Sequence, residues 1–246
     1  MLSQSKQKLI RSLQQKKYRV SERLFVAEGI KIVRDLLSSP YKTHSIYGTA
    51  AGFAALADID LTMECIEISQ MELSSISNQN TPEGLLALVY LDEGIYQPEE
   101  WTLILDAIND PGNFGTLIRT ARWFGIRNIF CTTGTVDAFN PKCVQAAKGS
   151  LFFSNIYYRS VEEIINLISK EQRMLYVADM DGFGAFEVEK DMPKALVLGS
   201  ESHGPNDAFR KLAGAIVSIP PHSSAAEMDS LNVAVSGGIL LSRLVG

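Results

Sequence analysis

The chain has 246 residues, of which 46% are hydrophobic and 21% are charged, and this composition excludes intrinsic disorder because it can support a buried core. No apolar run approaches the roughly 20 residues that a membrane-spanning helix needs, and no apolar signal core follows the basic N-terminus, so we expect a cytoplasmic protein with no membrane partner. The net charge of −5 does not by itself suggest a nucleic-acid partner.

The cysteines and histidines are too few and too scattered to build a disulfide framework or a metal site. None of them has the paired spacing that metal ligands show. They are Cys65, Cys131, Cys143, His44, His203 and His222. We therefore expect three reduced cysteines and no bound metal.

Basic residues are concentrated at the N-terminus. Residues 1–23 carry a net charge of +6, and the rest of the chain carries −11. Such an arm can supply the attraction to phosphate that the acidic remainder lacks, although the charges alone fit a solvated basic helix equally well. The basic residues of the arm are Lys6, Lys8, Arg11, Lys16, Lys17, Arg19 and Arg23.

Short strands and helices alternate after the arm. A strand at 24–27 leads into an amphipathic helix at 30–37. Further strands are predicted near 45–47, 65–68 and 85–90, with helices near 50–56 and 71–75. The acidic stretch 91–100 contains glycine and proline and lacks helical spacing, so the boundary between two domains is predicted there, with one domain over 1–94 and the other over 95–246.

The second domain shows a longer alternation of strand and helix. Strands are predicted at 101–108, 128–132, 174–179, 195–199 and 215–219. Helices are predicted at 114–124, 140–147, 160–170, 206–213 and 230–244. This order predicts an α/β fold in which a mostly parallel sheet is covered by helices on both faces.

Three of these strands run into polar loops before a helix. The first loop is Asn109–Gly115, the second is Gly199–Asn206, and the third follows Ile219-Pro220. The last helix is apolar or small on nearly every side, which predicts that it is buried all round. Its glycine pair, Gly237-Gly238, predicts the close approach of another backbone.

Together the three loops resemble the signature motifs of the SpoU (TrmH-like) branch of SPOUT RNA 2′-O-ribose methyltransferases. The first loop matches Asn-x-Gly-x-x-x-Arg, the second matches Gly-x-Glu-x-x-Gly, and the third matches Ile-Pro followed by Ser-Leu-Asn-Val. The matching residues are Asn113, Gly115, Arg119, Gly199, Glu201, Gly204, Ile219, Pro220, Ser230, Leu231, Asn232 and Val233. The stretch 221–229 is longer than the family's usual loop, and the opening Phe25–Gly29 resembles a small ribosomal-protein-like domain that binds RNA in many SpoU enzymes.

The resemblance implies a fold and a reaction that periodicity does not show. SPOUT domains thread their C-terminal segment into a trefoil knot, an exception to unknotted topology, and family members are homodimers whose active site draws on both subunits. The implied activity is methyl transfer from S-adenosylmethionine to a ribose 2′-hydroxyl of RNA, with ribosomal RNA favoured over transfer RNA. No metal is needed.

The resemblance also assigns roles to single residues. The catalytic set is Arg119, Asn113, Glu201, Ser230 and Asn232. The cofactor is expected to contact Leu198, Gly199, Glu201, Gly204, Ile219, Pro220, Leu231 and Asn232. The basic arm and Arg122 are expected to contact RNA. Free guanidinium has a pKa above about 12 and does not readily give up its proton, so Arg119 is expected to stabilise the developing alkoxide, and whether it also accepts the proton is left open. Glu201 is expected either to orient Arg119 or to brace the cofactor loop.

Each assignment has an ordinary structural alternative. Asn113 can be the N-cap of its helix, and Asp229 or Ser230 can cap the last one. For the whole chain the alternatives are an RNA-binding protein of this fold without catalysis, and a nicotinamide-binding oxidoreductase, whose fingerprint the loop at 112–115 matches only as G-x-x-G. A hydrolase triad of Ser230, His203 and Asp106 lacks a nucleophile-elbow signature.

Overall fold

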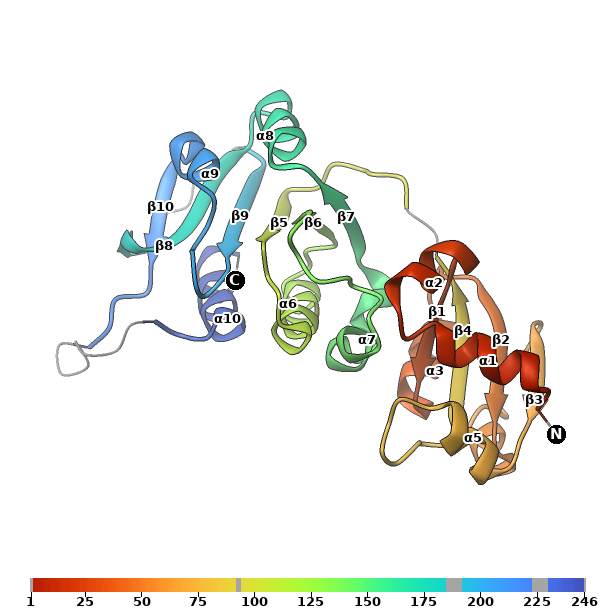
Figure 1. Cartoon of the computed structure of the whole chain (residues 1–246). Coiled ribbons are helices and arrows are strands. Elements are labelled where there is room, and N and C mark those ends of the chain that lie inside the picture. The colour runs from red at the N-terminus through yellow and green to blue at the C-terminus, as the bar shows by residue number, and fades with distance from the viewer. Residues whose placement is uncertain (1, 92–93, 185–191, 223–229, 246) are drawn as a thin grey trace. The chain divides into compact units, whose positions relative to one another are not determined.

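The computed structural model describes residues 2–91, 94–184, 192–222 and 230–245. The chain divides into two compact units, which are described separately (Figure 1). The first contains Met1–Asp92 and Asp137–Phe153, and the second contains Glu93–Val136 and Ser154–Gly246. The boundary predicted between residues 94 and 95, which would separate two independently folding domains, stays a prediction.

A four-stranded mixed sheet forms the centre of the first unit. The strand order is β1-β4-β2-β3. β1 (Leu24–Glu28) and β2 (Thr43–Gly48) pair antiparallel with β4 (Leu85–Tyr90), and β2 pairs parallel with β3 (Glu64–Glu67). All five residues of β1 are buried, so this strand lies within the core of the unit.

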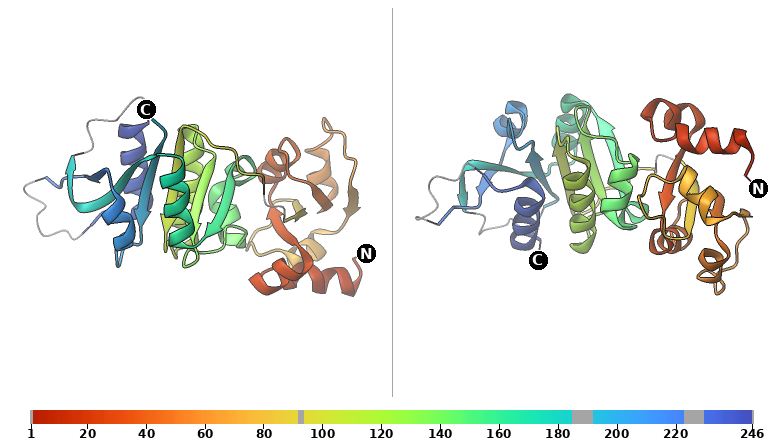
Figure 2. Two further views of the ribbon diagram at one scale, coloured as in Figure 1. Left: turned by 90° about the horizontal axis from the view of Figure 1, so that it is seen from above. Right: turned by 60° about the horizontal axis from the view of Figure 1, so that its bottom comes forward.

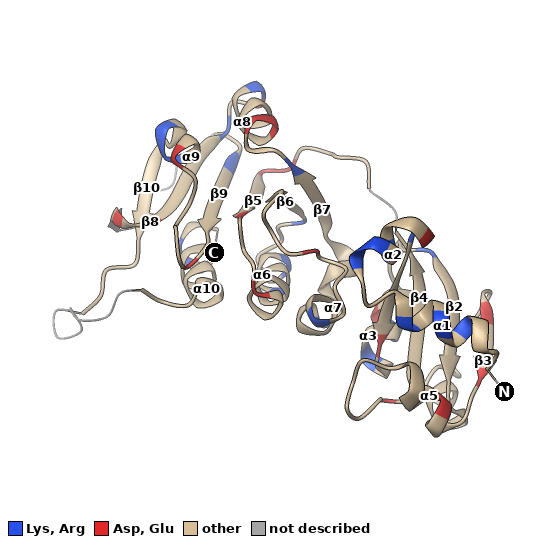
Figure 3. Ribbon diagram, in the orientation of Figure 1, with Lys and Arg blue, Asp and Glu red and all other residues tan. Residues whose placement is uncertain are grey.

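Helices cover this sheet, and two of them come from the basic arm. The arm folds as α1 (Gln4–Ser12) and α2 (Lys16–Glu22), and it buries Ile10 and Leu13 in the core. The other helices are α3 (Ile30–Leu37), α4 (Ala50–Ala54), α5 (Gln70–Ile76), α7 (Pro141–Ala147) and the 3₁₀ helix η1 (Ser150–Phe153). The arm is therefore a structural part of the unit as well as a charged surface (Figure 3).

Residues 137–153 are held in the first unit by aromatic and ionic contacts. The ring of Phe25 on β1 lies 4.7 Å from that of Phe139, measured between centroids, and 6.4 Å from that of Phe152. Arg19 of α2 donates to the carboxylate of Asp137 through Nε at 3.0 Å. These contacts join a segment from the middle of the sequence to the N-terminal sheet.

The second unit contains a six-stranded sheet in which neighbouring strands run parallel. The strand order is β10-β8-β9-β5-β6-β7. The strands are β5 (Trp101–Asp106), β6 (Asn128–Thr132), β7 (Asn155–Arg159), β8 (Met174–Gly184), β9 (Lys194–Gly199) and β10 (Ala215–Ser218). The parallel sheet was predicted, but β7 was missed.

Helices cover both faces of this sheet, as predicted (Figure 2). Ile104 of β5 and Val197 of β9 pack with the side chains of α8 (Val161–Lys170) and α9 (Asp207–Leu212) on one face. The other face carries α6 (Pro111–Trp123) and α10 (Val233–Leu244), which pack against each other. Because strand side chains alternate between faces, neighbouring residues of one strand belong to these two different cores.

The connections from β5 and from β9, which are neighbours in the sheet, lead to opposite sides of the sheet. β5 leads to β6 on one side, whereas β9 leads to β10 on the other. Loops that leave neighbouring parallel strands in opposite directions open a crevice at the carboxyl ends of those strands, and ligands of open α/β sheets bind there. The loops after Asp106 and Gly199 border this position.

Helix α10 is not buried all round, contrary to the prediction. Val233, Gly237 and Leu241 face the core, but Val235 is 51% exposed and Ile239 is 38% exposed. The apolar pattern could not distinguish a face buried within this chain from an apolar face on its surface. The trefoil knot expected around this helix stays a prediction.

The glycine pair of α10 approaches side chains rather than a backbone. A Cβ added to Gly237 would lie 2.5 Å from Leu117 Cδ2 of α6 and 2.8 Å from Leu198 Cδ1 of β9, whereas one added to Gly238 would lie 3.9 Å from Thr120 Cγ2. Gly237 is therefore the position at which α10 packs closely on the sheet and on α6.

Candidate active site

The first polar loop follows β5 and opens α6. Asp110 is the N-cap of α6, because its side chain accepts a hydrogen bond from Asn113 N at 2.7 Å, and Pro111 occupies the first turn. The suggested cap role of Asn113 is therefore wrong. Its amide side chain is left available for contacts outside the helix.

The second loop follows β9 and folds tightly on itself. Gly204 N donates to Ser200 O at 2.8 Å, and the φ angle of Gly204 is +66°. A Cβ added to Gly199 would lie 2.1 Å from Pro205 N and 2.2 Å from Gly204 C. Glycine is therefore required at 199 by the path of this loop itself, and the turn presents Glu201.

Asp106 fixes the end of this loop to the sheet. Its Oδ2 atom accepts a hydrogen bond from Asn206 N at 2.7 Å, and its Oδ1 atom accepts one from the Thr132 hydroxyl at 2.8 Å. The same hydroxyl accepts from Ala107 N at 3.0 Å, where the φ angle is +54°. Asp106 therefore braces the loop and has no contact with a histidine in the described residues, which removes it from the hydrolase triad.

The third loop meets the site at the start of α10. Asn232 is the N-cap, with its Oδ1 atom accepting from Ala234 N at 3.0 Å and from Val235 N at 3.3 Å. The helix begins at Val233 rather than at the predicted 230, so Ser230 is not the cap. Asp229, the other suggested cap, lies outside the described residues.

One carboxylate oxygen joins the three loops. Glu201 Oε1 accepts hydrogen bonds from Asn113 Nδ2 at 3.1 Å, Asn232 Nδ2 at 3.0 Å and Val233 N at 3.1 Å. Asn232 Nδ2 also lies 3.0 Å from Asn113 Oδ1. A carboxylate at the first turn of a 12-residue helix is stabilised by the helix dipole as well as by its hydrogen bonds. The structure thus brings together three of the five residues predicted to be catalytic.

Arg119 and Ser230 lie outside this network. Arg119 is exposed on α6, and within the described residues no hydrogen bond or ion pair joins it to Glu201 or to any other side chain. Of the two roles expected for Glu201, its hydrogen bonds to Asn232 and Val233 fit the bracing of a loop, and the orientation of Arg119 stays a prediction. Ser230 is also exposed. Both side chains are open to contacts with a bound substrate.

The predicted cofactor residues surround the carboxyl edge of β9 and β10. Ile219 and Pro220 follow β10, and Leu231 precedes the cap of α10. Leu231 is 45% exposed, and its backbone N–H and C=O have no hydrogen-bond partner in the described part of the chain. Apolar side chains beside open backbone donors and acceptors suit an adenosyl group. Leu198 is buried, so its side chain supports the loop from beneath.

The predicted RNA contacts of the arm divide into exposed and internal residues. Arg19 is 2% exposed and donates to Asp137 and to the carbonyls of Leu13 and Gln14. It is therefore a structural residue, and its assignment to RNA is wrong. Among the others, Lys6 pairs with Glu64, and Arg23 donates to Leu91 O.

The described residues contain neither a metal-ligand cluster nor a long apolar helix. No group of three or more histidine, cysteine, aspartate or glutamate side chains is placed to hold an ion. Within the same residues, no helix has the length and apolar character to cross a membrane.

Asp106, Asp110 and Asn206 are positioning residues that the motif comparison missed. Asp110 could have been recognised as a cap, because it directly precedes proline at the start of a helix. Asp106 gave no comparable signal, since an aspartate at the end of a strand does not reveal that its partners are 26 and 100 residues away.

Two family models match this chain. The SpoU rRNA Methylase family model matches residues 100–242, and the MRM3-like substrate binding domain model matches residues 5–87. The substrate binding domain model covers most of the first unit. The SpoU rRNA Methylase model covers nearly all of the six-stranded sheet and its helices.

Curated and solved relatives agree with these matches. The Bacillus subtilis 23S rRNA (guanosine(2553)-2′-O)-methyltransferase RlmP is 29% identical over 237 residues, covering 96% of this chain and 94% of the relative. A putative RNA methyltransferase of the TrmH family from Porphyromonas gingivalis is 35% identical, with a TM-score of 0.89 and coverage of 99% and 98%. An AdoMet-bound rRNA methyltransferase from Sinorhizobium meliloti is 29% identical, with a TM-score of 0.85 and coverage of 99% and 95%.

Proposed function

Because this chain belongs to the SpoU rRNA methylase family, we propose that it transfers a methyl group from S-adenosylmethionine to a ribose 2′-hydroxyl of ribosomal RNA. The observation that carries this proposal is the convergence of Asn113, Glu201 and Asn232 from three loops at the carboxyl edge of the sheet. Ribosomal RNA is preferred to transfer RNA because the full-length relative RlmP is named for a position in 23S rRNA.

The second and third loops hold the cofactor. Backbone groups of Gly199, Gly204, Ile219, Pro220 and Leu231 border its site, while Glu201 and Asn232 fix the loops that carry them. When bound, S-adenosylmethionine supplies the electrophilic methyl group. The protein's task is to hold the ribose oxygen in line with that group and to exclude competing water.

Arg119 acts on the RNA rather than on Glu201. Its guanidinium keeps its charge at neutral pH and offers five N–H donors, so it binds phosphate or the 2′-oxygen and stabilises the negative charge that develops as the hydroxyl proton leaves. Asn113 and Ser230 position the ribose. Arg122 lies in the last turn of α6 and lines a groove together with Arg127, Glu99 and Glu100, and its proposed role is to add positive charge for RNA outside the reacting nucleotide.

The first unit recognises the RNA. It contains the arm, whose outward-facing cations supply contacts to phosphate that do not depend on sequence. These are Lys6, Lys8, Arg11, Lys16, Lys17 and Arg23.

The protein acts as a cytoplasmic homodimer, with the C-terminal segment knotted as in other SPOUT domains. Trp123 on α6 is 85% exposed, and Val235 and Ile239 on the adjacent α10 also show apolar surface. We propose that these exposed apolar side chains on two adjacent helices contribute to the interface between subunits. Sedimentation of the wild type should give a dimer, and Trp123→Arg or Ile239→Arg should shift it toward the monomer. A wild-type monomer under assay conditions would refute the dimer but not the reaction.

The activity is tested by incubating the full chain with methyl-labelled S-adenosylmethionine and ribosomal RNA transcribed in vitro. A parallel reaction contains transfer RNA in place of ribosomal RNA. We expect label in ribosomal RNA at a position that resists alkaline hydrolysis, because a methylated 2′-oxygen cannot attack the adjacent phosphate. Mapping of these positions in cells with and without the protein identifies the nucleotide. RNA binding without transfer would favour the inactive RNA-binding protein, and calorimetric binding of NAD in place of S-adenosylmethionine would favour the oxidoreductase.

A further inference from the structure

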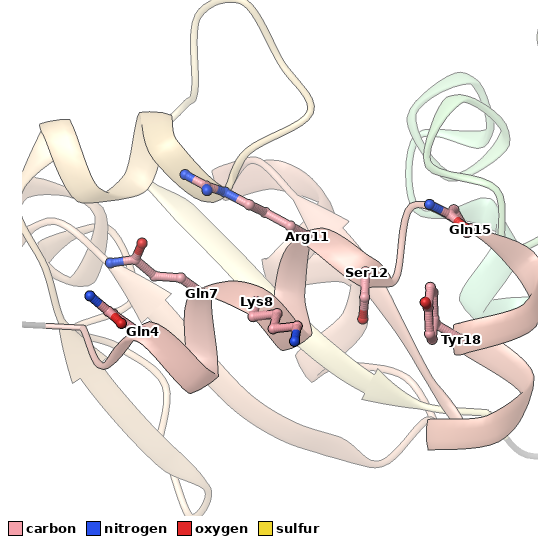
Figure 4. A pocket seen from close by; sticks show the side chains of 7 residues that line it. All are labelled: Gln4, Gln7, Lys8, Arg11, Ser12, Gln15 and Tyr18. Atoms are coloured by element: carbon pink, nitrogen blue, oxygen red, sulfur yellow. The ribbon is translucent and has the colours of Figure 1, made fainter.

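A groove of about 570 Å³ that is open to solvent lies along α1, α2 and the turn between them in the first unit (Figure 4). Three glutamines, one lysine, one arginine, one serine and one tyrosine line it, and no carboxylate does. The whole lining comes from the segment 4–18, so the folding of the arm into two helices creates the groove.

Several polar groups of the groove are available to a ligand. The side-chain amides of Gln4 and Gln15 and the ammonium of Lys8 have no partner among the described residues. Arg11 donates to Ser75 O through Nε at 2.6 Å, which fixes the guanidinium and leaves its two terminal nitrogens to other acceptors. The groove therefore offers amides with both donors and acceptors beside two cations.

Tyr18 places an aromatic surface at one end of this groove (Figure 4). Its side chain is 36% exposed, and Lys17 Nζ lies 4.6 Å from the ring centroid. The lysine occupies one face of the ring, so a planar group can stack only on the other. A cation at that distance also draws a phosphate toward the base that stacks there.

We infer that this groove binds an unpaired nucleotide of the RNA substrate, with the base stacked on Tyr18, its edge hydrogen-bonded by Gln15, and the flanking phosphates held by Lys8 and Arg11. The inference rests on the proposed action on RNA and specifies which part of that RNA the first unit recognises. A continuous A-form duplex would present phosphates but would keep its base faces stacked, whereas a loop or bulge presents both.

The test measures binding of the full chain to fluorescein-labelled U12 and to a blunt 12-base-pair RNA duplex by fluorescence anisotropy at several salt concentrations. We expect U12 to bind more tightly than the duplex. Tyr18→Ala should weaken U12 binding about five-fold or more, whereas Tyr18→Phe, which keeps the ring, should bind as the wild type does. Lys8→Ala should reduce the slope of log K against log salt by about 0.7, as expected for one lost phosphate contact to a single strand.

Matched controls separate the groove from the general surface. Tyr90→Ala removes an exposed tyrosine of the same unit that lies outside the groove, and Lys170→Ala removes an exposed lysine of α8. Both should bind U12 as the wild type does, and thermal melting should show that every variant is folded. Wild-type affinity of a folded Tyr18→Ala variant, or equal binding of duplex and U12, would overturn the inference.

Methyl transfer distinguishes failure of the groove from failure of the proposed activity. If both proposals hold, Tyr18→Ala raises KM for ribosomal RNA at unchanged kcat, because stacking on a nucleotide that does not react contributes equally to the ground state and the transition state. An unchanged KM would reject the groove while the methyltransferase proposal stands. Binding of U12 that depends on Tyr18 without any transfer by the wild type would reject the activity alone.

Discussion

Asp106 accepts a hydrogen bond from the backbone N–H of Asn206 at 2.7 Å, across 100 residues of sequence. Asn206 is the N-cap of α9 and ends the glycine loop that begins after β9, and Asp106 is only 6% exposed. A buried carboxylate therefore ties the proposed cofactor loop to the neighbouring strand. The contacts of Asp106 are structural, and we expect them to affect cofactor binding through this loop.

Replacing Asp106 by alanine should weaken cofactor binding. Asp106→Ala leaves the Asn206 N–H and the Thr132 hydroxyl without their acceptor, and for the buried hydroxyl alone this costs about 1–3 kcal/mol. We expect the dissociation constant for S-adenosylmethionine, measured by calorimetry, to rise about ten-fold or more. Asp106→Asn keeps an oxygen that can face Asn206, so its effect should be smaller. Equal affinity in the alanine variant and the wild type would show that the loop needs no such brace.

Asn113 and Asn232 should behave as a coupled pair. They hydrogen-bond to each other and share Glu201 Oε1, so removing one leaves the other in an incomplete network. In a double-mutant cycle on kcat/KM with Asn113→Ala and Asn232→Ala, we expect a coupling energy of at least about 0.5 kcal/mol. A cycle between Asn113 and Lys170, an exposed lysine of α8 outside the site, should be close to additive. Additivity in both cycles would contradict a functional network.

The sequence predicted the strands of the parallel sheet well, because they are buried on both faces and read as continuous apolar runs. β7 escaped prediction because Asn155-Ile-Tyr-Tyr-Arg159 is short and has polar residues at both ends. The two helices of the arm were anticipated only as a solvated basic helix. Their apolar residues are few, and it was the charges that dominated the pattern.

Only those site residues that belong to the three family motifs were predicted from the sequence. The three loops were found because their residues match a family pattern, but Asp106 and Asn206 have no local signal, since their partners are distant in sequence. The burial of Arg19 was missed for the same reason, because its acceptor Asp137 lies 118 residues away. Local sequence encodes elements and caps, whereas long-range polar contacts require the fold.

Arg119→Ala should abolish transfer while cofactor binding is retained. Arg119 is exposed and contacts none of the loops proposed to hold S-adenosylmethionine, and loss of a group that stabilises developing negative charge typically costs about 10²–10³ in kcat. Arg119→Lys keeps the charge but loses the fork of donors, so it should recover only part of the rate. Lys170→Ala serves as the control for a distant cation. Wild-type turnover in Arg119→Ala would refute the role assigned to this residue.

Stability of the first unit should depend on Glu72 in acid. Hydrogen bonds from Ser69 N, Leu2 N and the Ser69 hydroxyl lower the pKa of Glu72 from 4.5 to about 2. Because the folded state holds the charged form, this contribution is present above pH 4.5 and is lost as the pH falls toward about 2. The melting temperature of the wild type should therefore fall more over this interval than that of Glu72→Gln. Parallel curves for the two proteins would exclude this linkage.

The two neighbouring glycines of α10 should respond oppositely to alanine. Alanine is favoured over glycine within a helix by about 1 kcal/mol, and at Gly238 the new methyl group would meet only Thr120 Cγ2 at 3.9 Å. Gly238→Ala should therefore leave stability unchanged or raise it.

At Gly237 the same change would place a methyl group 2.5 Å from Leu117 and 2.8 Å from Leu198, both fully buried. Overpacking of this kind costs about 1–3 kcal/mol, which exceeds the gain in helix propensity. Because Leu198 lies directly before Gly199 in the proposed cofactor loop, we also expect weaker binding of S-adenosylmethionine in Gly237→Ala but not in Gly238→Ala. Thermal melting measures the stability of the two variants, and calorimetry measures their affinity for S-adenosylmethionine. A Gly237→Ala protein as stable as Gly238→Ala would mean that α10 does not need its close contact with the sheet.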